Sequence, residues 1–492
     1  MTPLAIYWTG FALYAVGVVF IGWHGYRKQT RSQQVGEAFW SAGRSLGPWS
    51  TGLSISAGFM SISWSCVYDV QLFYWYGLSA LWLLAIPWLF VMFFYYALTP
   101  RFRRLSAFSQ PEMLAQRFGS RVRVYFALPL AFVFLVWGGA EIYAAAQVLT
   151  PILHVPFHAI LLVIAIIVAV YSYLGGFSAV VATDRLQFAL VAFFVLGVSW
   201  IAGKAILSHD SLTSALRHLP PAPKHGASAF SLLAAGPGLI FMTLVAYLPG
   251  WAVETDIWLR LQAAKSDGAA RKGVLIATVN SVLFIAILPM LIGLAALYLY
   301  PPDGGAIPPR LQDGAAIFAV LISDHAPVLL SVLLIVGLAA ASMSTIDTCG
   351  NVVALSLSYD LLEPYLAHRK KEALTPVVSR VMSAGAIALA YFYAIFTDSL
   401  WDIFYLSSGI LTTTIFIPMV ALFSKRASTT RVQRAAMAGF LGTLLFYFLE
   451  KRGILVGVQP AWLSSTGLGY IVWGLVASAL AYGVKERQTT AR

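Results

Sequence analysis

A polar stripe within an otherwise apolar stretch is the first feature of this sequence that could do chemistry. In "AAASMSTIDTCGNVVALSLSYDL" (339–361), Ala341, Ser344, Thr345 and Thr348 stand at i, i+3, i+4 and i+7. That spacing places them on one face of a helix. Hydroxyl and carbonyl oxygens suit a hard cation and add no fixed charge. The stripe favours an ion site, although Ser and Thr in such helices also commonly donate to the carbonyl four residues earlier.

Acidic residues inside apolar stretches are the second such feature. Asp184 follows a double glycine in "SYLGGFSAVVATDRLQF" (172–188), and Glu141 lies in "GGAEIYAAAQ". A charge beside hydrocarbon is costly, so each position needs a reason. Asp184 either binds a cation, pairs with Arg185 or caps its helix. Glu141 is either a substrate contact or proton carrier, or a hydrogen-bonded strut between helices.

Two apolar stretches are interrupted in a way that an ordinary spanning helix is not. "STGLSISAGFMSISWS" (50–65) holds two glycines and six serines, and "AAGPGLIFMTLVAYLPGW" (234–251) holds Gly-Pro-Gly and Pro-Gly. They lie five apolar segments apart, so they enter a membrane from opposite sides. Paired interrupted segments indicate a transporter binding site, where unwound backbone offers carbonyls and amides at the midplane. The alternative is that Gly and Ser simply allow close helix packing.

The elements that position these residues are membrane spans. Of 492 residues, 59% are hydrophobic and only 11% are charged. Apolar runs of roughly 18 to 25 residues recur along the chain, each long enough to cross a bilayer. The fold class is therefore an all-α polytopic membrane protein. We expect about thirteen spans, near 4–24, 46–70, 75–98, 121–151, 157–174, 180–205, 229–250, 274–300, 326–358, 375–396, 400–424, 432–449 and 466–484.

The basic residues predict how the chain is oriented. The net charge is +12, which by itself would be compatible with a nucleic-acid partner. When 175–182 is treated as a turn, however, 26 of the 32 Lys and Arg residues lie on one side, Arg260 among them. Such an asymmetry marks the cytoplasmic side. We expect a multi-pass plasma (bacterial inner) membrane protein with its N-terminus outside and its C-terminus in the cytoplasm, and no nucleic-acid partner.

The sequence contains no pattern typical of an enzyme or a metalloprotein. Cys66 and Cys349 form no disulfide or metal-binding spacing, and the eight histidines are scattered. We find no nucleophile–base pair either. Function must lie within the membrane bundle and its short loops.

Five stretches together resemble the sodium:solute symporter family. They occur in the family's order and cover the chain from about 39 to 361. The resemblance implies the leucine-transporter-type fold, with one domain over 1–492: an extra helix (4–24), two inverted five-helix repeats (46–205 and 229–424) and two further helices (432–484). The five stretches are "FWSAGRSLGPWS" (39–50), "SAFSQPEMLAQRFGSRVR" (106–123), "YLGGFSAVVATDRLQ" (173–187), "RLQAAKSDGAARKG" (260–273) and the 339–361 stretch quoted above.

The resemblance also implies ion ligands. Ser344, Thr345 and the carbonyl of Ala341 match half of the family's main sodium site, and the carbonyls of Gly52 and Ile55 would supply the rest. Because "ISAGFMSIS" is one residue short of the usual spacing, Thr51 and Ser54 stay open as alternatives. A possible second cation site would comprise Asp184, Ser344, Asp347 and Thr348. Two facing carboxylates there would repel unless a cation or proton lay between them.

The expected function is sodium-coupled import of a small polar organic solute by alternating access, with Na⁺, the solute and the lipid bilayer as partners and no obligatory protein partner. Relatives carry sugars, amino acids, sialic acids, monocarboxylates or vitamins, and no positive side chain is evident in the interrupted segments to select a carboxylate. The alternatives are proton coupling through Asp184, Asp347 and Glu141, or a transporter-like membrane sensor. The candidate solute contacts are Ser54, Ser56, Glu141, Tyr247 and Trp251.

Overall fold

All regular elements in the described part of the chain are helices. The computed structural model describes residues 2–30, 44–104, 107, 109–368, 376–397, 399–422, 424–425 and 427–484. Parts of two stretches used above, 39–50 and 106–123, therefore lie outside the described residues, as does the side chain of Arg185 with its expected local pairing.

The first half of the chain carries the first interrupted segment and the longest helices. Its elements are α1 (Pro3–Thr30), α3 (Pro48–Phe59), η2 (Ile62–Tyr68), α4 (Asp69–Tyr76), η3 (Gly77–Trp82), α5 (Ala85–Arg103), α6 (Gln110–Phe118), α7 (Arg121–Leu153), α8 (Phe157–His209) and α9 (Leu212–Arg217).

The second half begins with the second interrupted segment. Its elements are α10 (Pro237–Trp251), α11 (Thr255–Ala263), α12 (Asp267–Ser281), η4 (Val282–Ile287), α13 (Leu288–Leu299), η5 (Pro309–Gly314), α14 (Ile317–His325), α15 (Val328–Leu355), η6 (Ser356–Leu362), α16 (Glu363–His368), α17 (Pro376–Ile395), α18 (Leu400–Ala421), α19 (Thr429–Lys451), α20 (Ala461–Ser464) and α21 (Gly469–Gly483).

The prediction of an all-helical polytopic membrane protein is confirmed. Among the described residues, nine helical stretches are long and apolar enough to cross a bilayer, or ten if the bent pair Ile62–Trp82 and Ala85–Arg103 forms one span. Two shorter apolar helices, Arg380–Ile395 and Gly469–Gly483, accompany them. The expected total of thirteen spans stays a prediction.

Helix α8 supplies two apolar stretches at the same level of the molecule. Tyr171, in the stretch Phe157–Leu174, donates a hydrogen bond to Asp347 of α15. Asp184, which precedes the stretch Leu186–His209, lies 3.8 Å from a guanidinium nitrogen of Arg260 that also contacts Thr348, one residue further along α15. Residues 171 and 184 would be about 20 Å apart along a straight helix. Residues close to the facing ends of the two apolar stretches of α8 therefore both approach the middle of α15, which is compatible with two successive spans.

Two helices are broken near the centre of the bundle. The chain leaves helical geometry at Met60 and Ser61, between α3 and η2, and again at residues 252–254, between α10 and α11. The second break lies beyond the expected segment 229–250. Residues 255–263 were predicted to belong to a cytoplasmic connection, but they form a buried half-helix. That prediction was wrong, because the polar residues of α11 face other buried polar groups.

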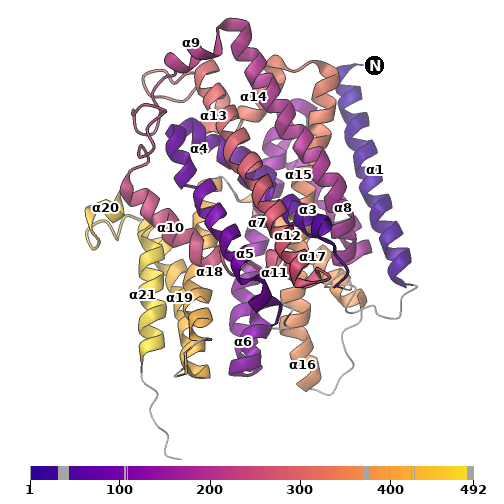
Figure 1. Ribbon diagram of the computed structural model, residues 1–492, viewed down its shortest axis with the longest axis vertical. Helices are drawn as coiled ribbons and strands as arrows, with labels where there is room; N and C mark the ends of the chain where they lie inside the picture. The colour runs from indigo at the N-terminus through magenta and orange to yellow at the C-terminus, as the bar shows by residue number, and fades with distance from the viewer. Residues whose placement is uncertain are drawn as a thin grey trace, which may run out of the picture.

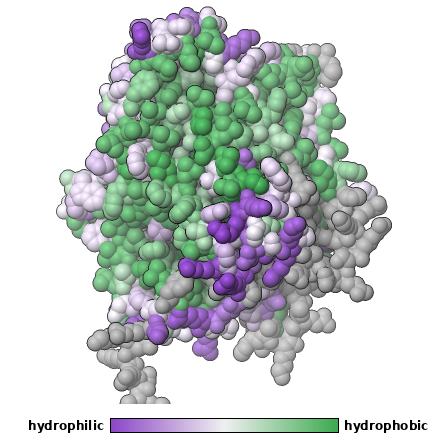
Figure 2. All heavy atoms as spheres, viewed as in Figure 1, coloured by the Kyte–Doolittle hydropathy of each residue, from purple (hydrophilic) through white to green (hydrophobic). Residues whose placement is uncertain are grey.

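Helix α15 lies at the core of the bundle and packs against α7, α8 and α17. Figure 1 shows α1 at one edge of the molecule and α19 with α21 at the other. Large apolar side chains such as Leu13, Phe93 and Leu441 are exposed on the outside. Figure 2 shows a broad hydrophobic surface that hydrophilic residues border above and below. This is the surface that a helical bundle presents to lipid.

Candidate functional site

The stripe on α15 meets the end of the first broken helix. The Ser344 hydroxyl donates to the carbonyl of Ala57 at 3.1 Å and to that of Ala341 at 3.0 Å. The Thr345 hydroxyl lies 3.4 Å from the carbonyl of Gly58 and 3.5 Å from that of Ala341. Five oxygens from two helices thus converge. Because Ala57 and Gly58 belong to the last turn of α3, their carbonyls also carry the negative end of its dipole.

The type and number of these oxygen donors, together with the negative end of the α3 dipole, suit a sodium ion. The arrangement differs from the expected one on the α3 side. The Gly52 carbonyl accepts from the Ser56 hydroxyl at 2.8 Å, and Gly52 itself packs against α12. Ile55 lines the neighbouring cavity. The structure therefore brings Ala341, Ser344 and Thr345 together with carbonyls of the final turn of α3 and not with that of Gly52.

Three of the four residues expected at a second cation site, Asp184, Asp347 and Thr348, come together near Arg260, whereas Ser344 bonds to the carbonyls of Ala57 and Ala341. Asp184 accepts a hydrogen bond from Ser54 and lies 3.8 Å from Arg260 Nη2. Arg260 Nη2 donates to the Thr348 hydroxyl at 3.0 Å. Asp347 accepts from Tyr171 at 2.8 Å. One oxygen of each carboxylate, Oδ1 of Asp184 and Oδ1 of Asp347, is buried without a hydrogen-bond partner in the described part of the chain.

Arg260 is fully buried and joins three helices. Its Nε donates to both the carbonyl and the hydroxyl of Ser54 at 3.0 Å, and its Nη1 lies 3.3 Å from Asp256 Oδ2. A Cβ added to Gly58 would lie 3.2 Å from Nη2. The close approach of α3 to α11 thus depends on a residue without a side chain. The predicted segment 234–251 holds no basic residue, but the second broken helix continues beyond it as α11, which carries Arg260.

A small cavity lies between the two helix breaks, beside the converging oxygens. Its volume is about 60 Å³, enough for a few water molecules. The described residues that line it are mostly aromatic, acidic or hydroxyl-bearing: Ile55, Gly58, Phe59, Ser61, Ser63, Trp64, Trp88, Trp137, Glu141, Trp251, Glu254, Asp256, Ile257, Thr345, Phe404 and Ser408. Thr345 belongs both to this wall and to the oxygen cluster, so the two sites share a residue.

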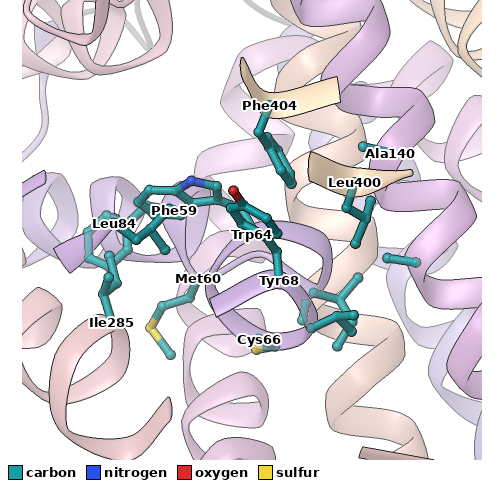
Figure 3. Close-up of a cluster of buried hydrophobic side chains, with 14 of the residues drawn as sticks. Phe59, Met60, Trp64, Cys66, Tyr68, Leu84, Ala140, Ile285, Leu400 and Phe404 are labelled. Atoms are coloured by element: carbon teal, nitrogen blue, oxygen red, sulfur yellow. The ribbon is translucent and has the colours of Figure 1, made fainter. Parts of the chain in front are cut away.

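Three tryptophans form one wall of the cavity. The Trp64 ring lies 5.0 Å from Trp88 and 5.5 Å from Trp251, and Trp88 lies 5.6 Å from Trp251, with interplanar angles of 66°, 86° and 75°. Tyr247 stacks on the far side of Trp251 at 4.1 Å. Figure 3 shows Phe404 of α18 pointing toward Trp64 from the opposite side.

Glu141 lines the cavity and clamps the broken helix. Its carboxylate accepts from the backbone N–H of Ile62 at 3.1 Å and of Ser63 at 3.2 Å, and also from the Ser63 hydroxyl. These donors are the first amides of η2, which have no partner within the helix. Glu141 is therefore both a wall residue and the interhelical strut that was one alternative for it.

Of the other candidate solute contacts, only Trp251 lines the cavity. Ser56 accepts a hydrogen bond from Asn280 of α12 at 2.8 Å, and Ser54 belongs to the Arg260 cluster. Tyr247 supports Trp251 from behind. The two serines do not line this cavity, because a helical position alone does not say which neighbour a side chain faces.

Sequence reasoning missed Glu254, Asp256 and Arg260, as well as Trp64 and Trp88. The signal available was the charge pattern "ETDIWLRLQ" (254–262) beside an interrupted segment, where three ionisable residues occur within seven positions. We interpreted it as a loop, but charges next to a transporter's broken helix can equally belong to its site.

Known proteins resemble this chain along most of its length. The sequence model described as the sodium:solute symporter family matches residues 39–442. A "Sodium/sialic acid symporter NanT" of Aliivibrio fischeri is 23% identical, covering 92% of this chain and 90% of that protein. A "Sodium/glucose cotransporter" of Vibrio parahaemolyticus is 25% identical, covering 90% and 84%. Among solved structures, a Na⁺-coupled sialic acid symporter in a substrate-bound outward-open state aligns with a TM-score of 0.71 over 96% of this chain and 97% of that one, at 17% identity.

Proposed function

Since the chain belongs to the sodium:solute symporter family, it is a sodium-coupled membrane transporter, and we propose that it imports a small polar organic solute by alternating access. The solute would bind in the cavity between the two helix breaks. Sodium would bind next to it, at the junction of α3 and α15.

The observation that carries this proposal is the convergence of oxygens at the end of α3. We assign the main sodium site to the carbonyls of Ala57, Gly58 and Ala341 with the hydroxyls of Ser344 and Thr345. A sodium ion there would hold α3 against α15. Because Thr345 also lines the cavity, the ion and the solute would favour the same arrangement of the wall.

We further propose that a single sodium accompanies each solute. The guanidinium of Arg260 lies between Asp184 and Asp256 and contacts Thr348, so a tethered cation already occupies the region expected to bind a second one. A mobile cation there would face repulsion from Arg260.

The proposed layout is thirteen spans, with α1 preceding two inverted five-helix repeats (46–205 and 229–424) and α19 and α21 following them. The two broken helices would then be equivalent members of the two repeats. We propose a plasma-membrane location with the N-terminus outside. This is supported by the basic residues of 101–123, near α6, which lies at the opposite end of the molecule from the start of α1 (Figure 1).

The driving force is adequate for import. One sodium moving inward under 100 mV yields about 2.3 kcal/mol, and a tenfold concentration gradient adds about 1.4 kcal/mol. Together they sustain roughly several-hundredfold accumulation of a neutral solute.

Thermal melting tests the sodium site. The purified full-length protein would be melted across a NaCl series, with KCl keeping the ionic strength constant. We expect a saturable rise of the Tm that follows a single-site curve. Ser344→Ala should raise the half-saturating sodium concentration at least about tenfold. Ser342→Ala, a buried serine two residues away that bonds only within α15, is the matched control. An unchanged Tm in NaCl would refute the site, and a Hill coefficient near two would refute the single sodium.

A further inference from the structure

The charges of the central site point to the chemistry of the solute. Among the described residues that line the cavity, none is Lys, Arg or His, whereas Glu141, Glu254 and Asp256 all contribute carboxylates. The nearest guanidinium, that of Arg260, is engaged by Ser54, Asp256 and Thr348 behind the wall. The cavity wall is therefore acidic.

These carboxylates are not equivalent. Glu141 is satisfied by the first amides of η2, and Asp256 by the Ile257 N–H at 2.7 Å and by Arg260. The carboxyl group of Glu254 interacts with that of Asp256. Its Oε2, however, is buried with no hydrogen-bond partner among the described residues, while its side chain lines the cavity. Only 8% of Glu254 is exposed, so water offers little compensation. A buried carboxylate oxygen in this position needs a donor or a cation from the ligand.

The aromatic wall suits the same kind of ligand. Trp64, Trp88 and Trp251 stand nearly perpendicular to one another and present indole faces and edges in several directions. Indole is the aromatic group that binds organic cations best, and aromatic walls beside a carboxylate recognise ammonium groups. The carboxamide side chains that would pair with many hydroxyls are absent from the described lining residues.

We propose that the solute is a small organic cation, an amine or quaternary ammonium compound, whose charged group binds between the tryptophan wall and Glu254. This inference rests on the proposed function and narrows its solute class. It sets this chain apart from its relatives named for sialic acid and glucose.

The test uses a charged probe and its uncharged twin. In choline, the nitrogen bears three methyl groups; in 3,3-dimethylbutan-1-ol, a carbon atom replaces it, so the two differ in charge and scarcely in shape. The purified full-length protein would be melted at saturating NaCl with increasing choline, tetramethylammonium, ethanolamine, 3,3-dimethylbutan-1-ol, glucose or N-acetylneuraminate. We expect saturable stabilisation by at least one of the three cations and none by the uncharged twin.

Glu254→Gln, which keeps the shape and removes the charge, should weaken binding of the stabilising cation roughly thirtyfold or more and leave the half-saturating sodium concentration within about twofold. Trp251→Leu should also weaken binding of that cation, by about tenfold. Glu450→Gln is the control, since this half-buried carboxylate pairs with Gln459, distant from the cavity in the C-terminal part of the chain.

The outcomes separate this inference from the proposed function. Stabilisation only by glucose, N-acetylneuraminate or the uncharged twin, or by none of the three cations, would overturn the cationic class while a sodium-dependent Tm upheld the transporter. An unaltered cation affinity in Glu254→Gln would remove Glu254 from the site. A Tm insensitive to sodium would count against the proposed function itself, whichever solutes bind.

Discussion

At the scale of single residues, Arg260 has the largest influence on the centre of this protein. It is the one guanidinium beside Asp184, Asp256 and Asp347 within the described residues, and its side chain is fully buried. A buried charge is tolerated only when it is paired and hydrogen-bonded. Removing Arg260 would leave several carboxylates close together with no compensating charge.

A double-mutant cycle would test this role. Arg260→Gln alone should lower the free energy of unfolding by about 3–5 kcal/mol, since it leaves Asp184 and Asp256 unpaired. Asp184→Asn added to it should restore part of that loss, because the repulsion then falls. The Tm of the wild type, of each single variant and of the double variant would be measured in KCl. Strictly additive effects would show that Arg260 and Asp184 do not interact.

The same residue shows where prediction from sequence stops. Ser344 and Thr345 could be proposed as ion ligands because local spacing places them on one polar stripe and the family resemblance points to the same positions. The role of Arg260 could not be proposed in this way, because its partners come from α3, α8 and α15, up to about 200 residues away. Only the folded chain reveals that these groups meet.

At the scale of elements, the spans and the presence of two interrupted segments were predictable, but the position of the second break was not. Long apolar runs set the positions of α1, α7, α15, α18 and α19 within a few residues. The second break, by contrast, lies at 252–254, after Pro249 and Gly250, which remain inside α10. The residues at this break, Ala252, Val253 and Glu254, include no Gly or Pro that would end a helix locally, so tertiary packing must decide where the helix ends.

Close helix packing gives a prediction at this scale. Gly439 of α19 faces α18, and a Cβ there would lie 2.1 Å from the Thr413 carbonyl oxygen, so the backbones would have to separate. Gly439→Ala should therefore destabilise the protein by about 1–3 kcal/mol. Gly385→Ala in α17, where a Cβ meets no atom within 4 Å, should be neutral or stabilise by up to about 1 kcal/mol. The Tm of the two variants would be measured, and equal changes in Tm would contradict the close packing of α19 on α18 at Gly439.

At the scale of the whole molecule, the proposed sodium site and the proposed solute site lie at the same helix junction, that of α3 and α15. The converging oxygens connect α3 to α15, and the cavity beside them is closed by η2, α5, α7, α10, α11 and α18. The space open to water-sized molecules within it is about 60 Å³, so movements of these elements would change how much room a solute finds there.

The native cysteine Cys349 can report such movements. Cys349 of α15 is 3% exposed and lies one turn beyond Thr345. Its Cβ packs against Gly138 of α7, so a maleimide should react with it only while α15 has separated from its neighbours in the bundle. If sodium holds α3 against α15, the open fraction falls as the site fills. At ten times the half-saturating sodium concentration, the labelling rate should drop about tenfold relative to KCl.

The experiment would use Cys66→Ser, so that Cys349 is the single thiol, and mass spectrometry to follow its modification. Ser344→Ala in the same background should lose most of the sodium effect, because the ion then binds more weakly. Protein unfolded in detergent gives the rate of the freely accessible thiol. Labelling at that rate in the native protein, or at equal rates in NaCl and KCl, would mean that sodium does not control the joint between α3 and α15. Slower labelling in NaCl that depends on Ser344 would connect the ion site to the opening of the bundle, the step on which coupled import depends.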